Sequence, residues 1–341
     1  MRALILGGSR FIGRRLADAL LEAGHSVTLF NRGRTDDGLG DRVRRLSGDR
    51  GSEGDLSRAL DGLTFDAAWD FLCYDGDDAR RAVAHLAGRV GRLVHISTCS
   101  VYWATGDFPC PVPEEEFDRH GDFAERPGSI EYAYGYAKRM AERVLMEAHR
   151  EGRLPVTIVR PPVVAGEDEP GLRYASYCHR LEDGLPLILP DGGFVSFRHV
   201  YAGDLARALA RIPDTTVAAG RAYNLASPEI LSVRRLVIDI AGLMDRSPEL
   251  VEIPGPILRR LAPELEVTAF SPFSQRAPQI PAVDRAIGEL AWSPTPYPVW
   301  LERIVRWWVE EGRPARLVPP ASRHRDREIA MVAAYRERLG N

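Results

Sequence analysis

Two residues four positions apart, Tyr134 and Lys138, are the strongest candidates for chemistry in this sequence. Residues with this spacing share one face of a helix, and apolar residues at helical intervals predict a helix over 136–150. A nearby ammonium lowers the pKa of a phenol, so Tyr134 is expected to serve as an acid or base near neutral pH. Tyr132 and Tyr136 lack a lysine four residues later. A tyrosine and a lysine with this spacing also occur by chance in many helices, so the neighbouring motifs must show whether this pair is functional.

A cluster of hydroxyls follows the strand predicted over 92–97. The stretch Ser97-Thr98-Cys99-Ser100-Val101-Tyr102 would lie at the carboxyl end of that strand. Ligands of open parallel sheets bind at this edge. An ordinary polar turn is the alternative interpretation of such a cluster.

The first thirteen residues, M-R-A-L-I-L-G-G-S-R-F-I-G, combine a short apolar run, three glycines and the start of a helical pattern. Gly7 and Gly8 would allow a tight turn and a close backbone approach to a pyrophosphate, and Gly13 would let helix and strand pack closely. A second strand over 26–30 ends at Asn31-Arg32, near the expected position of the residue that binds the adenosine ribose. The alternative interpretation of these thirteen residues is an ordinary strand-to-helix turn that binds no cofactor.

Alternating strands and helices must position these groups. Further strands are predicted at 42–46, 65–72, 155–160 and 222–225, with helices between them. This alternation predicts an α/β fold with a doubly wound parallel sheet and a smaller, discontinuous C-terminal substrate lobe. We expect a Rossmann domain at 1–165 with a return segment at about 198–226, a lobe at 166–197 and 227–315, and a helical tail at 316–341. The tail could close over the core or contact a second subunit.

Composition limits the classes of protein. The 341 residues carry a net charge of −3, which gives no general attraction to nucleic acid. The sequence shows no signal peptide and no apolar run that would span a membrane. Its four cysteines have no metal spacing, so we expect reduced thiols, no metal and a cytoplasmic location. The acidic run Glu114-Glu115-Glu116 is predicted to be a solvated loop face.

The order of these motifs resembles the extended short-chain dehydrogenase/reductase superfamily, especially its NAD-dependent epimerase/dehydratase branch. The glycine loop, the hydroxyl strand end and the Y-x-x-x-K helix are followed by R-P-P-V-V-A-G at 160–166. The resemblance extends to Asn224-Leu225-Ala226 and Leu290-Ala291-Trp292-Ser293-Pro294. It implies that Thr98 orients the reacting oxygen, Tyr134 is the acid/base, and Lys138 binds the nicotinamide ribose and tunes the tyrosine. Asp49 would contact the adenine. The cofactor residues implied are Gly7, Gly8, Ser9, Arg10, Phe11, Ile12, Gly13, Asn31, Arg32, Asp49 and Lys138.

The sequence departs from the family pattern at the cofactor site. Arg10 replaces the middle glycine of the loop, and Asn31-Arg32 stand where NAD-specific members often carry an acid. Arginine suits bidentate phosphate recognition, so we expect NADP to be favoured over NAD. The alternative is that Arg10 and Arg32 are solvated surface charges.

Other departures concern the substrate. Sugar-nucleotide dehydratases carry Asp-Glu where this chain has Cys99-Ser100, so a 4,6-dehydratase is not expected. The segment Arg160-Pro161-Pro162-Val163 is similar to the reductase side of the family. Arg198 and Arg276 fall near family positions that bind a diphosphate, although both could be structural or surface arginines. The candidate substrate residues are therefore Cys99, Arg198 and Arg276.

The resemblance implies hydride transfer at a carbinol or ketone carbon of a nucleotide-sugar-like substrate, in an epimerase or a reductase. The first alternative is an NADPH-dependent ketone reductase of a non-sugar metabolite. The second is a stem-loop RNA-binding relative, because the loop G-G-x-R-F-I-G resembles that of chloroplast RNA-binding members. A homodimer through the helices at about 77–90 and 136–150 is expected.

Overall fold

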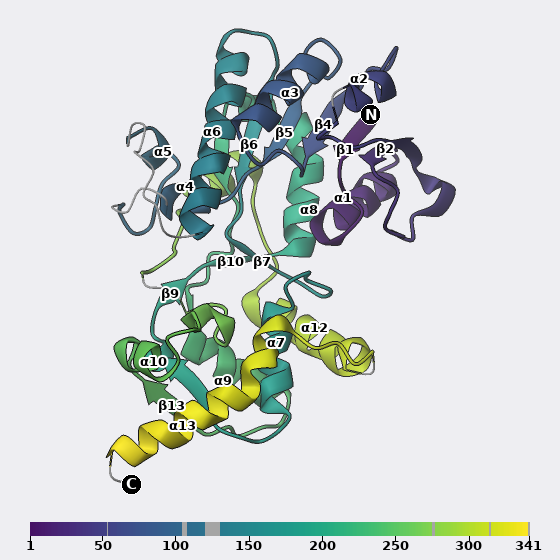
Figure 1. Ribbon diagram of the computed structural model, residues 1–341. Coiled ribbons are helices and arrows are strands. Elements are labelled where there is room, and N and C mark those ends of the chain that lie inside the picture. The colour runs from purple at the N-terminus through teal and green to yellow at the C-terminus, as the bar shows by residue number, and fades with distance from the viewer. Residues whose placement is uncertain (53, 104–107, 120–129, 275–276, 314, 340–341) are drawn as a thin grey trace. The chain divides into compact units, whose positions relative to one another are not determined.

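The computed structural model describes the chain except residues 53, 104–107, 120–129, 275–276, 314 and 340–341. Two compact units emerge (Figure 1). Unit 1 comprises Met1–Val164, His199–Ala226 and Pro281–Pro294. Unit 2 comprises Ala165–Arg198, Ser227–Ile280 and Thr295–Asn341. None of the helices in the described part of the chain is long and apolar enough to cross a membrane.

Unit 1 is built on a seven-stranded sheet in the order β11-β6-β5-β4-β1-β2-β3, and its neighbouring strands pair in parallel. The strands are β1 (Arg2–Leu6), β2 (Ser26–Asn31), β3 (Arg44–Ser47), β4 (Ala67–Asp70), β5 (Leu93–Ile96), β6 (Val156–Arg160) and β11 (Ala222–Asn224). Successive residues of the central strands face opposite hydrophobic clusters, as a sheet covered on both faces requires. The predicted doubly wound Rossmann fold is confirmed.

Helices cover both faces of this sheet (Figure 1). On one face α1 (Phe11–Glu22) packs beside α8 (Ala202–Arg211), and on the other α3 (Gly76–Leu86) packs beside α6 (Ile130–Arg150). The helix predicted from residue 136 in fact starts at Ile130. Tyr134 and Lys138 therefore both lie within α6, and one turn separates them.

A late segment of the chain joins unit 1. The sequence places 281–294 in the C-terminal lobe, but the structure holds it beside the edge strand β11. Trp292 Nε1 donates to the Ala226 carbonyl at 2.7 Å, and Arg285 Nη1 donates to the Ala222 carbonyl at 3.0 Å. These are long-range contacts to backbone carbonyls, which local sequence patterns do not reveal.

We expect Gly13→Ala to destabilise the protein by about 1–3 kcal/mol, the usual range for overpacking. A Cβ at Gly13 would lie 2.3 Å from the Gly8 Cα, a backbone atom that cannot move aside as a flexible side chain could. Gly242, in α9 (Val233–Leu243), is a matched control because nothing lies within 4 Å of its ideal Cβ. Urea unfolding should show Gly242→Ala unchanged or slightly stabilised. Equal stability of the two variants would contradict the close approach of loop and helix.

Unit 2 is organised around two paired strands and several helices. The strands β8 (Leu187–Pro190) and β13 (Leu250–Ile253) pair in parallel. The helices include α7 (Arg173–Leu181), α9, α10 (Gly255–Leu261), α12 (Tyr297–Trp307) and the C-terminal α13 (Arg325–Leu339). Met331 and Val332 of α13 are buried against Ile188, Ile253 and Leu258. The tail therefore forms part of the core of unit 2.

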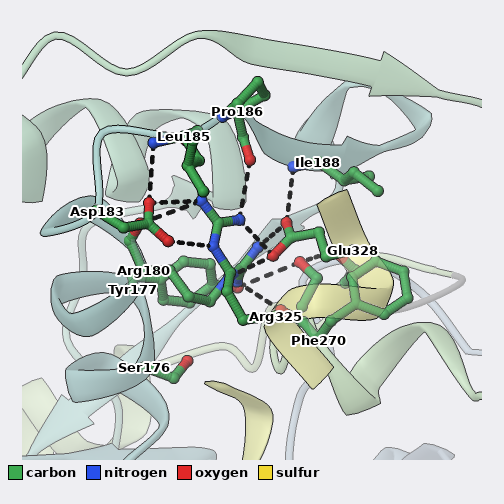
Figure 2. Close-up of polar contacts among 12 residues, drawn as sticks. Ser176, Tyr177, Arg180, Asp183, Leu185, Pro186, Ile188, Phe270, Arg325 and Glu328 are labelled. Carbon is green, nitrogen blue, oxygen red and sulfur yellow. Dashed lines mark hydrogen bonds and ion pairs between the residues drawn. The ribbon is translucent and has the colours of Figure 1, made fainter. Parts of the chain in front are cut away.

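A buried ion-pair network fixes this last helix (Figure 2). Both carboxylate oxygens of Glu328 accept from the Arg180 guanidinium, and Arg180 also donates to the Phe270 carbonyl. Arg325 Nη1 donates to Glu328 at 2.6 Å and its Nε donates to Asp183 at 2.8 Å. Glu328 also accepts from the Ile188 N–H at 2.9 Å. The network thus joins α13 to α7 and to β8.

Candidate functional site

Lys138 lies where β4 and β5 end. Its Nζ donates to the Cys73 carbonyl at 2.7 Å and to the Ile96 carbonyl at 2.8 Å, and the residue is 2% exposed. Burial lowers the pKa of Lys138, while the neighbouring groups Cys73, Asp70 and Glu142 oppose that shift. The ammonium is therefore held at a fixed point at the carboxyl edge of the sheet.

Tyr134 lies one turn before Lys138 and is 40% exposed, so its phenol is within reach of a ligand. It lies close enough to Thr98 for the threonine hydroxyl to lower the pKa of its phenol. Thr98 Oγ1 accepts from the Ser100 N–H at 3.1 Å, a contact that orients the hydroxyl. The structure thus brings together the three residues that the sequence selects as catalytic candidates, Thr98, Tyr134 and Lys138.

The pKa of Tyr134 is shifted in the direction opposite to the sequence expectation. Burial raises it, the nearby Tyr74 raises it further, and the hydrogen bond with Thr98 only partly opposes these effects. Lys138 does not offset them because its ammonium is directed at two backbone carbonyls. In this state the Tyr134 phenol keeps its proton at neutral pH, which is the form that a proton donor requires.

A buried polar network links the elements that surround the site. Arg160 Nη2 pairs with Glu142 Oε2 at 2.6 Å, and Ser97 Oγ donates to the same carboxylate. Arg160 Nη1 donates to the Tyr102 hydroxyl at 2.7 Å, which in turn donates to Asn224 Oδ1 at 2.8 Å. These contacts tie α6 to the ends of β5, β6 and β11, the elements that carry Thr98 and Lys138.

Glu114 belongs to this buried region, contrary to the expectation of a solvated acidic loop. Its Oε1 accepts from the Asn224 N–H at 2.9 Å, and Arg285 lies 4.0 Å from its carboxylate. Glu116 is also buried, and of the three acids only Glu115 is exposed. The sequence misleads here because the charge of Glu114 is compensated by residues more than 100 positions away.

The glycine loop has the backbone shape that a dinucleotide pyrophosphate needs. Gly7 and Gly8 have φ values of 96° and 84°, a region that favours glycine. The α1 helix starts directly after them at Phe11, so its amino end points at the loop. Asn31 Nδ2 donates to Ser9 Oγ at 3.0 Å and links the loop to the end of β2. A Cβ at Gly8 would lie 2.7 Å from Ile5 Cγ2, and one at Gly13 would lie 2.3 Å from the Gly8 Cα, so glycines are needed for this close packing of the loop. A loop of this shape before a helix fits a dinucleotide cofactor.

The remaining cofactor candidates lie around the same loop. Arg10 Nη2 donates to Thr35 Oγ1 at 3.3 Å, which places it over the segment after β2. Arg32 Nη1 lies 3.9 Å from Asp49 Oδ2, and both side chains are more than half exposed. Asp49 also accepts from the Gly51 N–H at 2.8 Å. Phe11 and Ile12 open the helix, with the Phe11 side chain buried.

The three substrate candidates differ in what the structure shows. Cys99 is 1% exposed and its Sγ donates to the Arg160 carbonyl at 3.2 Å, so the thiol faces inward and not toward a ligand. The chain turns after β5, and this turn buries Cys99 against Val101 and Tyr102. Arg198, in unit 2, donates through Nε to the Pro228 carbonyl at 3.1 Å. Arg276 lies outside the described residues.

Two features of the site are missed by motif reasoning. Lys138 is the only lysine in the whole sequence, although lysine and arginine together number 45. A lysine kept at one position in a chain otherwise limited to arginine is a compositional signal for lysine-specific chemistry. The second feature is Tyr74, whose ring centroid lies 5.1 Å from Lys138 Nζ. No motif marks Tyr74, because only the fold brings it to α6.

Comparison with known proteins agrees with this geometry. The profile of the NAD dependent epimerase/dehydratase family matches residues 3–226, which include the glycine loop, Tyr134 and Lys138. The chain belongs to this family. This is a family of NAD-dependent epimerases and dehydratases.

Individual relatives differ in their activities. The chain is 27% identical to 2′-dehydrokanamycin reductase of Streptomyces kanamyceticus, over 94% of this chain and 84% of that protein. It is 23% identical to the chloroplast stem-loop binding protein of 41 kDa b of Arabidopsis thaliana, over 68% of this chain and 60% of the relative. The structure of UDP-glucuronic acid 4-epimerase from Bacillus cereus with NAD superposes with a TM-score of 0.67 at 18% identity, covering 90% of this chain and 98% of that one. That identity supports the shared fold alone.

Proposed function

We propose that this protein is an NAD(P)-dependent oxidoreductase that interconverts a ketone and a secondary alcohol, with Tyr134 as the acid/base. The observation that carries the proposal is the grouping of Tyr134 and Thr98 beside the buried ammonium of Lys138. Thr98 would hydrogen-bond to the reacting oxygen, and Tyr134 would exchange a proton with it. Lys138 would hold the ribose next to the nicotinamide. The nicotinamide, when bound, supplies or accepts the hydride.

Of the two forms of this chemistry, a reductase of a sugar-like ketone is favoured. The 2′-dehydrokanamycin reductase matches 94% of this chain. A nucleotide-sugar epimerase is the second candidate, because Arg198 falls near a family position that binds diphosphate. An epimerase must keep its cofactor through a complete cycle, whereas a reductase must exchange it at each turnover.

One relative suggests a function that is not enzymatic, the binding of RNA. The net charge of −3 and the ordered site around Tyr134 argue against it. Salt-dependent RNA binding that survives Tyr134→Phe would favour it instead. A homodimer through α3 and α6 and a cytoplasmic location remain predictions.

NADP is the favoured cofactor because Arg10 and Arg32 flank the end of β2. We expect the protein to purify with an empty, exchangeable site and to bind NADPH about tenfold more tightly than NADH, the effect of one good charge-assisted contact. Arg32→Ala should abolish this preference, whereas Arg34→Ala, an exposed arginine two residues later, should retain it. The measurements are mass spectrometry of nucleotide released on denaturation, and fluorescence titration of the apo protein.

Each outcome of this experiment separates the alternatives. Stoichiometric oxidised cofactor in the purified protein would favour the epimerase. Equal dissociation constants for NADPH and NADH would contradict the role of the arginines. No affinity for either nucleotide would contradict the oxidoreductase proposal as a whole.

A further inference from the structure

Among the residues that the structure describes, no carboxylate forms an ion pair with the ammonium of Lys138. Within the described part of the chain, the two nearest buried acids are already paired: Asp70 with Arg50 at 2.7 Å, and Glu142 with Arg160 at 2.6 Å. None of the ion pairs among those residues includes Lys138. Its partners are the two backbone carbonyls and the face of the Tyr74 ring. A buried cation with so little compensation favours loss of its proton.

The Tyr74 ring lies on the solvent side of this ammonium. Tyr74 is 51% exposed while Lys138 is 2% exposed, and the centroid of the ring is 5.1 Å from Nζ. Aromatic faces attract cations within about 6 Å, and the attraction is stronger where water is excluded. The ring therefore lies against the ammonium and offsets part of the cost of burying its charge.

The backbone holds Tyr74 in this position. Its N–H donates to Asp78 Oδ2 at 2.8 Å, in the first turn of α3, and Arg50 Nη2 donates to the Asp78 carbonyl at 3.1 Å. The carbonyl of the preceding residue, Cys73, accepts the hydrogen bond from Lys138. The same turn after β4 thus provides both a carbonyl and an aromatic face for one ammonium.

We propose that Tyr74 is a positioning residue for Lys138, and that its aromatic ring keeps the ammonium charged and in place at the carboxyl edge of the sheet. The role depends on the ring and not on the hydroxyl. This proposal deepens the proposed function. It rests on that function only where it predicts cofactor binding and catalysis, because the pKa of Lys138 can be measured without cofactor or substrate.

Other charged and titratable groups surround Lys138 and remain unchanged in the test. The neighbouring structural elements contribute Asp70, Cys73, Arg50, His95, Glu142 and Arg160. Burial keeps the pKa of His95 well below its usual value, so this histidine is neutral near pH 7. The pKa of Tyr134, one turn before Lys138, also depends on the Tyr74 phenol. Tyr74→Phe removes this phenol and keeps the ring, so the comparison of Tyr74→Leu with Tyr74→Phe isolates the effect of the ring.

The test uses the fact that Lys138 is the sole lysine. Protein labelled with 13C at lysine Cε gives one lysine resonance, and its pH titration reports the pKa of Lys138. We expect Tyr74→Leu to lower this pKa by about one unit, which corresponds to about 1.4 kcal/mol. Tyr74→Phe should leave the pKa close to that of the wild type. With the cofactor titrated in parallel, Tyr74→Leu should weaken binding by roughly three- to tenfold and Tyr74→Phe by less than twofold.

Three results would overturn the proposal: an unchanged pKa of Lys138 in Tyr74→Leu, an equal shift in both variants, or a cofactor affinity that follows the hydroxyl and not the ring. Failure of the proposed function is a different result. It would appear as a ring-dependent pKa of Lys138 in a protein whose redox activity survives Tyr134→Phe.

Discussion

Lys138→Arg is expected to lower turnover by roughly 100-fold or more, the usual range for loss of an acid–base group or its partner. The Nζ atom donates to two carbonyls that lie at 2.7 and 2.8 Å, in a space that is closed to solvent. A guanidinium is planar, longer and more rigid than an ammonium, so it cannot make both contacts from the same point. Because Lys138→Arg keeps the positive charge, the loss of turnover would report the changed geometry of the cation and not the absence of its charge.

Arg150→Lys is the matched control for this substitution. Arg150 is exposed at the end of the same helix, so exchange of the two cations there should leave turnover and stability unchanged. The measurements are steady-state kinetics with the substrate once it is identified, and thermal unfolding of both variants. Activity of Lys138→Arg close to that of the wild type would contradict the role proposed for Lys138.

Glu328→Ala is expected to destabilise the protein by about 3–5 kcal/mol, the range for breaking a buried ion pair. Glu328 is fully buried, and its removal would leave the guanidinium of Arg180 without its carboxylate in the core of unit 2 (Figure 2). The Ile188 N–H and Arg325 would lose an acceptor as well. The effect should appear as a lower urea midpoint, and limited proteolysis should cleave first within unit 2.

A surface ion pair between this helix and the segment after α10 provides the control. Arg327 and Glu264 lie 3.0 Å apart, and about half of each side chain is exposed. Glu264→Ala should change the free energy of unfolding by less than about 1 kcal/mol. Similar losses for Glu328→Ala and Glu264→Ala would show that the network of Figure 2 does not fix the last helix.

The fold class and the candidate site residues could be predicted from the sequence alone. Strands buried on both faces are continuous apolar runs, and the glycine loop must keep its φ values and its close approach at Gly13, so both leave a local trace. Tyr134 and Lys138 are linked by helical spacing within α6, which is also local. These predictions depend only on neighbours along the chain.

The environment of each group, in contrast, depends on how distant segments of the chain pack together. The raised pKa of Tyr134, the inward-facing thiol of Cys99 and the buried carboxylate of Glu114 all arise from residues distant in sequence. The same is true of Tyr74 over Lys138 and of α13 in the core of unit 2. Burial and charge compensation depend on which elements pack together, and no periodicity along the chain encodes them.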